Sequence, residues 1–190
     1  MPNRFGAQRF GRDAQNSAAA RAILAGKRAR VDRRKARFLL SALQAEVFNL
    51  VLARRPLGLD RVEAGDVARV EASGGLFVVE DAALEAPRAE HFEISATGPI
   101  FGTKMKAPEG AVAEREDAVM RELEIPLGDA LRAPRGIRMR GGRRAVRVRP
   151  DSLRVERADA DLILHFALQS GSYATVLLEE LLGEYAEGRE

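Results

Sequence analysis

The sequence predicts an α+β fold, in which helices and antiparallel strands share a core. Residues 36–55 have the apolar spacing of a long amphipathic helix, and residues 65–80 have the alternation and glycine turn of a β-hairpin. Hydrophobic residues make up 46% of the 190-residue chain, which is enough for a packed core and argues against a disordered chain.

The helices are predicted from the spacing of their apolar residues. Between 36 and 55, Leu40, Leu43 and Val47 recur on one stripe at helical spacing, and Pro56 ends the helix. Three further helices are predicted, over 17–25, 109–124 and 173–182.

The strands are predicted around glycine-rich turns. Residues 73–75, Ser-Gly-Gly, separate the two strands of the hairpin. Residues 98–102 contain two glycines and a proline, so we expect a tight turn or loop there. Other strands are predicted over 91–95, 144–156 and 161–168. The last of these has four apolar side chains on one face: Leu162, Leu164, Phe166 and Leu168. A hairpin with one helix makes a thin core, so this closing segment would need further strands to pack against.

The composition excludes several classes of site. The absence of cysteine excludes disulfides, thiol nucleophiles and cysteine-ligated zinc. The only histidines, His91 and His165, lie far apart in the sequence, so we expect no metal site. No stretch approaches the roughly 20 apolar residues of a membrane span, and the first residues have no signal-peptide pattern. We therefore expect a soluble, cytoplasmic monomer.

Basic residues cluster in two runs. Residues 132–149 contain eight arginines and no acidic residue, and residues 27–37 contain seven basic residues and one aspartate. On a turn and strand, alternate arginines share a face that can neutralise successive phosphates. The alternative is a solubilising surface without a ligand. The candidate RNA contacts in the arginine-rich run are Arg138, Arg140, Arg143, Arg144 and Arg147.

The chain opens with a doubled unit, Arg4-Phe5-Gly6 followed by Arg9-Phe10-Gly11. Arginine can bind phosphate or stack on a base, phenylalanine can stack, and glycine permits close approach of the backbone. These properties make Arg9 a further candidate RNA contact. The alternative is a structural turn whose two phenylalanine rings belong to the core.

Gly171-Ser172-Tyr173 lies between the last predicted strand and the last helix. The glycine allows a sharp bend, Ser172 can cap the helix, and Tyr173 stands at the helix start, where side chains are often open to a ligand. The alternative is a tyrosine of the core. No pair of carboxylates stands out for acid–base catalysis, and no phosphate-binding glycine loop is present. Pattern alone thus predicts a basic, RNA-binding α+β protein.

Four stretches add a family resemblance. The string PNRFGAQRFG at residues 2–11 closely resembles the signature P-N-[aromatic]-F-G-x-Q-R-F-G of the TruD family of tRNA pseudouridine synthases, with Arg4 in place of the usual aromatic. Three further stretches resemble the same family in the same order: RFLLSALQAEVFN (37–49), SATGPIFG (95–102) and LQSGSYATVLLEELL (168–182). Together they span nearly the whole chain.

The resemblance implies both an architecture and a reaction. It implies a TruD-type insertion domain with its entry segment over 1–147, and the C-terminal strands and helix of a pseudouridine-synthase catalytic domain over 148–190. Enzymes of this family convert the uridine at position 13 of certain tRNAs to pseudouridine without a cofactor. An aspartate acts as nucleophile or base on the flipped-out uridine, and an aromatic ring stacks on the base. Tyr173 matches the position of that ring, so the resemblance makes it the substrate-binding residue.

One part of the family pattern has no counterpart here. The catalytic aspartate of the family lies in a Gly-x-Lys-Asp motif upstream of the P-N-x-F-G string, with asparagine and phenylalanine contacts near it. None of the four lysines of this chain precedes an aspartate. We therefore expect the chain to be the C-terminal portion of such an enzyme, with no catalytic residue of its own and no activity alone. The alternatives are a non-catalytic RNA-binding protein derived from the family and an interaction module for an acidic protein.

Overall fold

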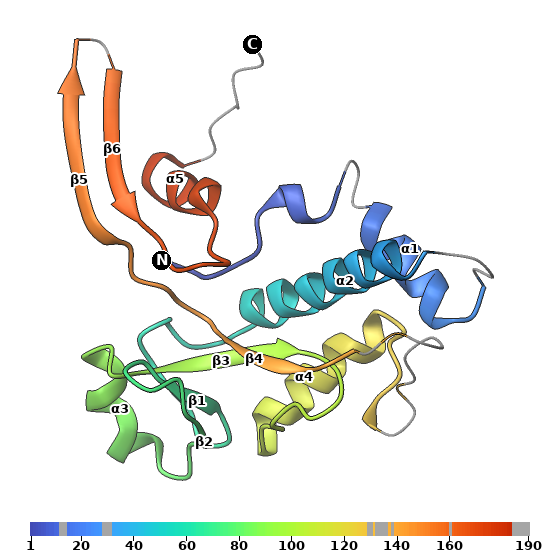
Figure 1. The fold of residues 1–190 in the computed structure, drawn as a ribbon. Helices are drawn as coiled ribbons and strands as arrows, with labels where there is room; N and C mark the ends of the chain where they lie inside the picture. Colours follow the sequence, from blue (N-terminus) through green and yellow to red (C-terminus); the bar gives the residue numbers. More distant parts are fainter. Residues whose placement is uncertain are drawn as a thin grey trace.

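The computed structural model describes residues 1–11, 15–27, 32–128, 131, 137, 139–159 and 161–183. A four-stranded antiparallel sheet of order β2-β1-β3-β4 packs against a long helix, and a two-stranded hairpin extends away from this body (Figure 1). The strands are β1 (Val67–Val70), β2 (Leu76–Val78), β3 (Ile94–Ile100), β4 (Gly142–Ala145), β5 (Asp151–Ala158) and β6 (Asp161–Ala167). The helices are the short 3-10 helix η1 (Ala7–Arg9), α1 (Gln15–Leu24), α2 (Arg33–Ala53), α3 (Ala82–Glu90), α4 (Gly110–Glu122) and α5 (Ala174–Leu182). This arrangement confirms the predicted α+β class.

Helix α2 is the central element of the hydrophobic core. Asp32 caps it by accepting hydrogen bonds from the backbone N–H groups of Arg34 (3.0 Å) and Lys35 (3.1 Å). By length and composition α2 is apolar enough to cross a membrane, contrary to our expectation that no stretch is. Half of the apolar stretch is nevertheless buried inside the protein, where α2 packs against α1, α4 and β3. We therefore interpret it as a core helix.

Strand β3 runs through residues where we expected a turn. Of the segment 98–102, the first three residues continue the strand to Ile100, with Pro99 opposite Arg143 of β4. Strand β1 pairs with β3 only as far as Ala96, so β3 has a single neighbour at Pro99. A proline is tolerated here because its missing N–H faces no strand on the side of β1.

Gly98 is explained by packing rather than by a turn. A Cβ atom at this position would lie 2.9 Å from Cδ2 of Phe48, closer than real side chains approach. The glycine therefore lets α2 press an aromatic ring directly onto β3.

The predicted strand over 144–156 divides in two. Strand β4 ends at Ala145 and β5 begins after Pro150. The residues between them pair with the start of the chain: the N–H of Asn3 donates to the carbonyl of Val146 (2.8 Å). Helix α3 has no counterpart among the predicted elements, because Pro87 lies inside it and argues against a helix.

Arg143 on β4 is a correction to the predicted RNA contacts. Its guanidinium is completely covered and donates to both carboxylate oxygens of Glu116 on α4, at 2.8 and 2.6 Å. It also donates to Oγ1 (3.0 Å) and to the carbonyl (2.8 Å) of Thr97 on β3. All of its nitrogens have protein acceptors, so Arg143 fastens α4 to the sheet and is not available to phosphate.

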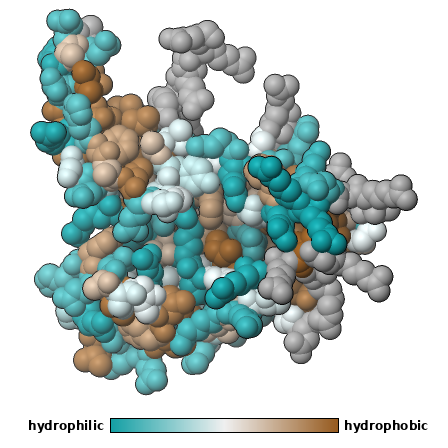
Figure 2. Space-filling view, in the orientation of Figure 1, coloured by the Kyte–Doolittle hydropathy of each residue, from teal (hydrophilic) through white to brown (hydrophobic). Residues whose placement is uncertain are grey.

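The hairpin β5–β6 presents an uncovered apolar face among the described residues. Val155 pairs with Leu164 and Arg157 with Leu162, so apolar side chains of both strands gather on one side. Val155 and Leu162 are 61% and 62% exposed. Figure 2 shows hydrophobic side chains on the hairpin and on the neighbouring α5, at the upper left of the molecule. A two-stranded sheet of this kind is marginal without another layer.

We expect Arg143→Met to lower the free energy of unfolding by about 3–5 kcal/mol at neutral pH, because it leaves the carboxylate of Glu116 buried without its partner. Burial already raises the pKa of Glu116, against the opposing hydrogen bonds and charge of Arg143. In the variant this pKa should rise further above its unfolded value, so the folded state binds the proton more tightly. Stability should then increase as the pH falls through the folded-state pKa. The deficit should therefore be smaller at pH 5 than at pH 8.

Urea unfolding followed by circular dichroism at both pH values measures this deficit. Arg54→Met is the matched control, since its ion pair with Glu122 is exposed and should contribute less than about 1 kcal/mol. A loss in Arg143→Met no greater than in this control would contradict the structural role of the buried pair.

Candidate functional site

A cluster of aromatic and polar side chains joins the start of the chain to the turn before α5. Its members are Asn3, Phe5, Phe48, Asn49, Arg144, Ser172 and Tyr173. They come from the opening segment, α2, β4 and the residues that lead into α5. In Figure 1 the opening segment passes between α2 and α5, which brings these distant parts of the sequence together.

Asn3 links three segments through its side chain. Its Nδ2 donates to the carbonyl of Ala145 (3.0 Å). Its Oδ1 accepts from Nη2 of Arg144 (2.6 Å) and from Oγ of Ser172 (3.2 Å). Asn3 is only 9% exposed, so these bonds satisfy a buried amide and fix the opening segment against β4 and the turn.

Arg144 lies at the centre of the cluster. Its Nε donates to the carbonyl of Asn3 (2.8 Å) and its Nη2 to the carbonyl of Gly171 (2.9 Å). Its guanidinium carbon lies 4.2 Å from the ring centre of Phe5 and 5.5 Å from that of Phe48. Burial lowers the pKa of Arg144 to about 10, so the group remains a cation at neutral pH.

These contacts modify the prediction for Arg144. Most of its donors are used within the protein, and only Nη1 has no acceptor among the described residues. Arg144 is therefore a fixed cation with one nitrogen left for a ligand. It is not one of a row of freely exposed phosphate contacts.

Tyr173 is neither a core tyrosine nor an isolated surface residue. It is half-buried at the N-cap of α5, in an extended conformation. Its ring packs edge-to-face on Phe5, with 5.9 Å between ring centres, and Phe5 packs in the same way on Phe48 at 5.6 Å. The three rings form a continuous series from the core of α2 to the partly exposed edge of the cluster.

Two small features hold Phe5 in this series. Asn49 on α2 accepts from the N–H of Phe5 (2.8 Å) and donates to its carbonyl (2.9 Å). At Gly6 a Cβ would lie 2.5 Å from Oε1 of Gln8, 2.9 Å from Oγ1 of Thr175 and 3.0 Å from Cδ1 of Tyr173, so the glycine lets the chain pass close to the tyrosine ring. The first Arg-Phe-Gly unit therefore places the ring of Phe5 between those of Phe48 and Tyr173.

Arg147 is a second correction. It is 8% exposed, and burial lowers its pKa. Its guanidinium donates to Oγ of Ser95 (2.9 Å) and to the carbonyls of Ile94 (2.8 Å) and Ala89. Because acceptors on β3 and at the end of α3 take up these donors, Arg147 links the two elements inside the protein and is not an RNA contact.

The remaining predicted contacts differ in placement. Arg140 is exposed beside Thr103, where the backbones form an isolated bridge. Arg9 belongs to η1 and is half-buried against α2, where it donates to Oγ of Ser41, away from the Tyr173 cluster. Arg138 lies outside the described residues.

The described members of the cluster include no carboxylate. Arg4, where the family signature has an aromatic, forms ion pairs with Glu179 and Glu180 of α5. Among the described residues no group of three or more His, Cys, Asp or Glu side chains is placed to hold a metal ion. The cluster thus offers aromatic rings and a cation, and a reacting carboxylate remains a prediction for residues outside this chain.

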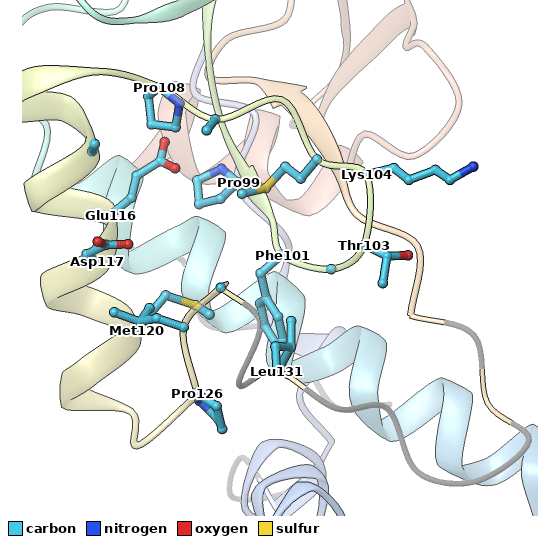
Figure 3. A pocket seen from close by; sticks show the side chains of 16 residues that line it. Pro99, Phe101, Thr103, Lys104, Pro108, Glu116, Asp117, Met120, Pro126 and Leu131 are labelled. Atoms are coloured by element: carbon cyan, nitrogen blue, oxygen red, sulfur yellow. The ribbon is translucent and has the colours of Figure 1, made fainter.

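A separate cavity of about 770 Å³ lies between α4 and the loop after β3 (Figure 3). Phe101, Met120 and Leu131 point toward it, while Lys104 points away. Glu116 lines the cavity but is held by Arg143. None of the residues of the Tyr173 cluster lines this cavity, so we treat it as separate from the candidate site.

The family resemblance singled out Tyr173, but the sequence analysis missed Asn3, Phe5 and Asn49 as members of its surroundings. The signal for the first two was present in the opening string itself, which we interpreted as an entry segment. Asn49 ends the resembling stretch 37–49, next to a buried phenylalanine. Its polar side chain at the edge of an apolar stripe was the available signal.

Comparison with known proteins gives consistent matches. A family model described as tRNA pseudouridine synthase D (TruD) matches residues 20–181. Proteins named tRNA pseudouridine synthase D are 42% identical over 98% of this chain in Anaeromyxobacter sp. (strain Fw109-5) and 41% identical over 96% in Thermus thermophilus. This chain covers 55% and 50% of those relatives, so it spans about half of their length.

A solved structure shows the same fold. It is the putative tRNA pseudouridine synthase D of Methanosarcina mazei, with a TM-score of 0.72 at 20% identity, over 94% of this chain and 60% of that one. The family match covers most of the sequence, and the fold agrees with it along nearly the whole chain. The chain therefore belongs to the TruD family of tRNA pseudouridine synthases.

Proposed function

We propose that this chain forms part of an enzyme that isomerises a uridine of tRNA, at position 13, to pseudouridine. The observation that carries the proposal is the Tyr173–Phe5–Phe48 ring series beside the fixed cation of Arg144. The names of the relatives supply the reaction and the substrate class. The reaction breaks the bond from ribose C1′ to N1 of uracil, forms one from C1′ to C5, and moves the C5 proton to N1. No oxidant or reductant is required.

The cluster would hold the base during this rearrangement. The target uridine must leave its stack, and an exposed aromatic edge compensates part of the lost stacking. Tyr173 is a half-buried ring at the end of the series, and its ring packs edge-to-face on Phe5. The free Nη1 of Arg144 would donate to a phosphate or to a uracil carbonyl.

The rest of the catalytic domain would complete the site. The uncovered apolar face of β5–β6 requires another layer, and the relatives are about twice as long as the matched region. We propose that the added layer supplies the aspartate and that the boundary between the two parts lies near 147–148. The substrate class implies a cytoplasmic enzyme that needs no cofactor, and a monomer is the simplest assembly.

The absence of a carboxylate from the described cluster supports one alternative to an enzyme, a protein that binds RNA without catalysis. A non-catalytic RNA-binding protein of the same family would keep the rings and the basic residues without the chemistry. The two functions differ in one result, which is pseudouridine formation once the missing layer is supplied.

We expect no pseudouridine from the purified 190-residue chain acting on an unmodified tRNA with uridine at position 13. Adding, or fusing ahead of Met1, the part of the Anaeromyxobacter protein that this chain does not match should produce pseudouridine, because it supplies the aspartate and covers the hairpin. Chemical marking of pseudouridine and primer-extension stops measure the product. The Anaeromyxobacter part alone is the control. Activity of the 190 residues alone would refute the external aspartate, and an inactive but folded fusion would favour the non-catalytic alternative.

In the fusion, we expect Tyr173→Ala to abolish turnover while changing tRNA affinity less than about threefold, because phosphate contacts dominate binding. Tyr173→Phe should retain most of the activity, since it keeps the ring. Turnover assays and filter binding at fixed salt separate the two effects. Normal turnover in Tyr173→Ala would remove the stacking role.

A further inference from the structure

Phe38 is an unusual surface residue of α2. It is 47% exposed, although its neighbours Leu39 and Leu40 are buried in the core. The guanidinium of Arg9 lies 5.7 Å from the centre of its ring. Arg9 donates to Oγ of Ser41 (2.7 Å), and Ser41 in turn donates to the carbonyl of Phe38 (2.6 Å). An exposed ring is thus paired with a cation that a hydrogen bond holds in place.

The surface around this ring is strongly basic. The first turns of α2 expose Arg33, Arg34, Lys35 and Arg37, and none of them forms an ion pair with another described residue. Cations in the first turn of a helix oppose its dipole, and like charges repel, so this arrangement lowers the stability of α2. A polyanion bound across these residues would relieve both effects. Figure 2 shows the hydrophilic surface at this end of the molecule, on the right.

The opening segment connects this patch to the Tyr173 cluster. Phe5 is bonded to Asn49, and Arg9 is bonded to Ser41, so residues 5–9 run along α2 in the direction opposite to the helix. Phe38 and Asn49 are 11 residues apart, which is three helical turns on one face and about 16 Å. The two Arg-Phe-Gly units therefore serve two places: the first builds the ring cluster, and the second holds Arg9 against Phe38.

We propose that Phe38 and Arg9 form a second stacking site, for an unpaired base of the same RNA, and that the basic first turns of α2 bind the phosphates beside it. This proposal rests on the proposed function, because it places the site on the path of the tRNA substrate. At a stacked spacing of about 3.4 Å per nucleotide, about five nucleotides span the stretch of α2 between Phe38 and Asn49, where the Tyr173 cluster begins. An exposed ring with a cation on it suits single-stranded RNA, since every base offers a face for stacking.

The test compares Phe38→Ala, Phe38→Trp and Arg37→Gln in the 190-residue chain. Fluorescence anisotropy would measure binding to a short single-stranded RNA and to a duplex RNA of equal length, over a range of salt concentrations. We expect Phe38→Ala to weaken single-strand binding about tenfold without changing its salt dependence, and to leave duplex binding unchanged. Phe38→Trp should bind like the parent chain. Arg37→Gln should reduce the slope of log K against log salt by about 0.7.

Leu84→Ala is the matched control, because Leu84 is an apolar residue on α3 that is 73% exposed. All variants should melt within a few degrees of the parent chain, since Arg37, Phe38 and Leu84 are all exposed. If Phe38→Ala and Leu84→Ala bind single-stranded RNA equally well, the stacking site is refuted. An equal loss on duplex RNA, or tighter binding to polyglutamate than to RNA, would also overturn it, the latter in favour of an acidic protein partner.

Failure of this inference is distinguishable from failure of the proposed function. If the fused enzyme makes pseudouridine while Phe38→Ala behaves like Leu84→Ala, only the second stacking site is wrong. If Phe38→Ala weakens single-strand binding as expected while the folded fusion makes no pseudouridine, only the proposed isomerisation is wrong.

Discussion

The buried guanidinium groups at β4 and the residues after it hold this fold together. Alternation along the strand sends Arg143 and Arg144 to opposite sides: the first to Glu116 on α4, the second to Asn3 and the turn before α5. Arg147 then ties the same segment to β3 and the end of α3. Arg143 has an acceptor for every nitrogen, whereas Arg144 and Arg147 each donate through two nitrogens to neutral acceptors of the described residues. Loss of Glu116 would therefore leave the buried cation of Arg143 without its anionic partner. The placement of the helices around the sheet depends on these three side chains.

Sequence patterns predicted the elements that local periodicity defines. The α2 stripe, the β1–β2 hairpin and the apolar face of β6 follow from spacing alone, because the periodicity that defines each of them lies within its own segment. The prediction of RNA contacts was wrong at Arg143 and Arg147, because their roles depend on residues far away in the sequence. The alternation of the arginine run is the same whether a strand faces phosphate or a carboxylate, and the carboxylate that binds Arg143 is 27 residues away, on α4. The Gly98–Pro99 strand was missed because Phe48, which requires the glycine, lies on another element.

The candidate site shows the same limit more sharply. The place of Tyr173 came from a family resemblance, and its position at the start of α5 agrees with the pattern of the turn before it. Its surroundings depend on contacts between residues that are 27 to 169 positions apart, which no local pattern contains. The opening string contains Asn3 and Phe5, but their roles depend on contacts with β4 and α2, which only the three-dimensional structure shows.

The amino end has a consequence for joining other polypeptides to this one. Met1 and Val148 exchange two backbone hydrogen bonds, of 3.0 and 3.1 Å, and Pro2 pairs antiparallel with Arg147. In the same antiparallel register, a peptide attached ahead of Met1 would leave beside residues 149–151, toward the base of the protruding hairpin. Pro150 has no N–H for the next pair, so an attached tag would begin against this edge of the protein without a continuous ladder to hold it. Affinity handles and fluorophores are better attached through the exposed face of α3.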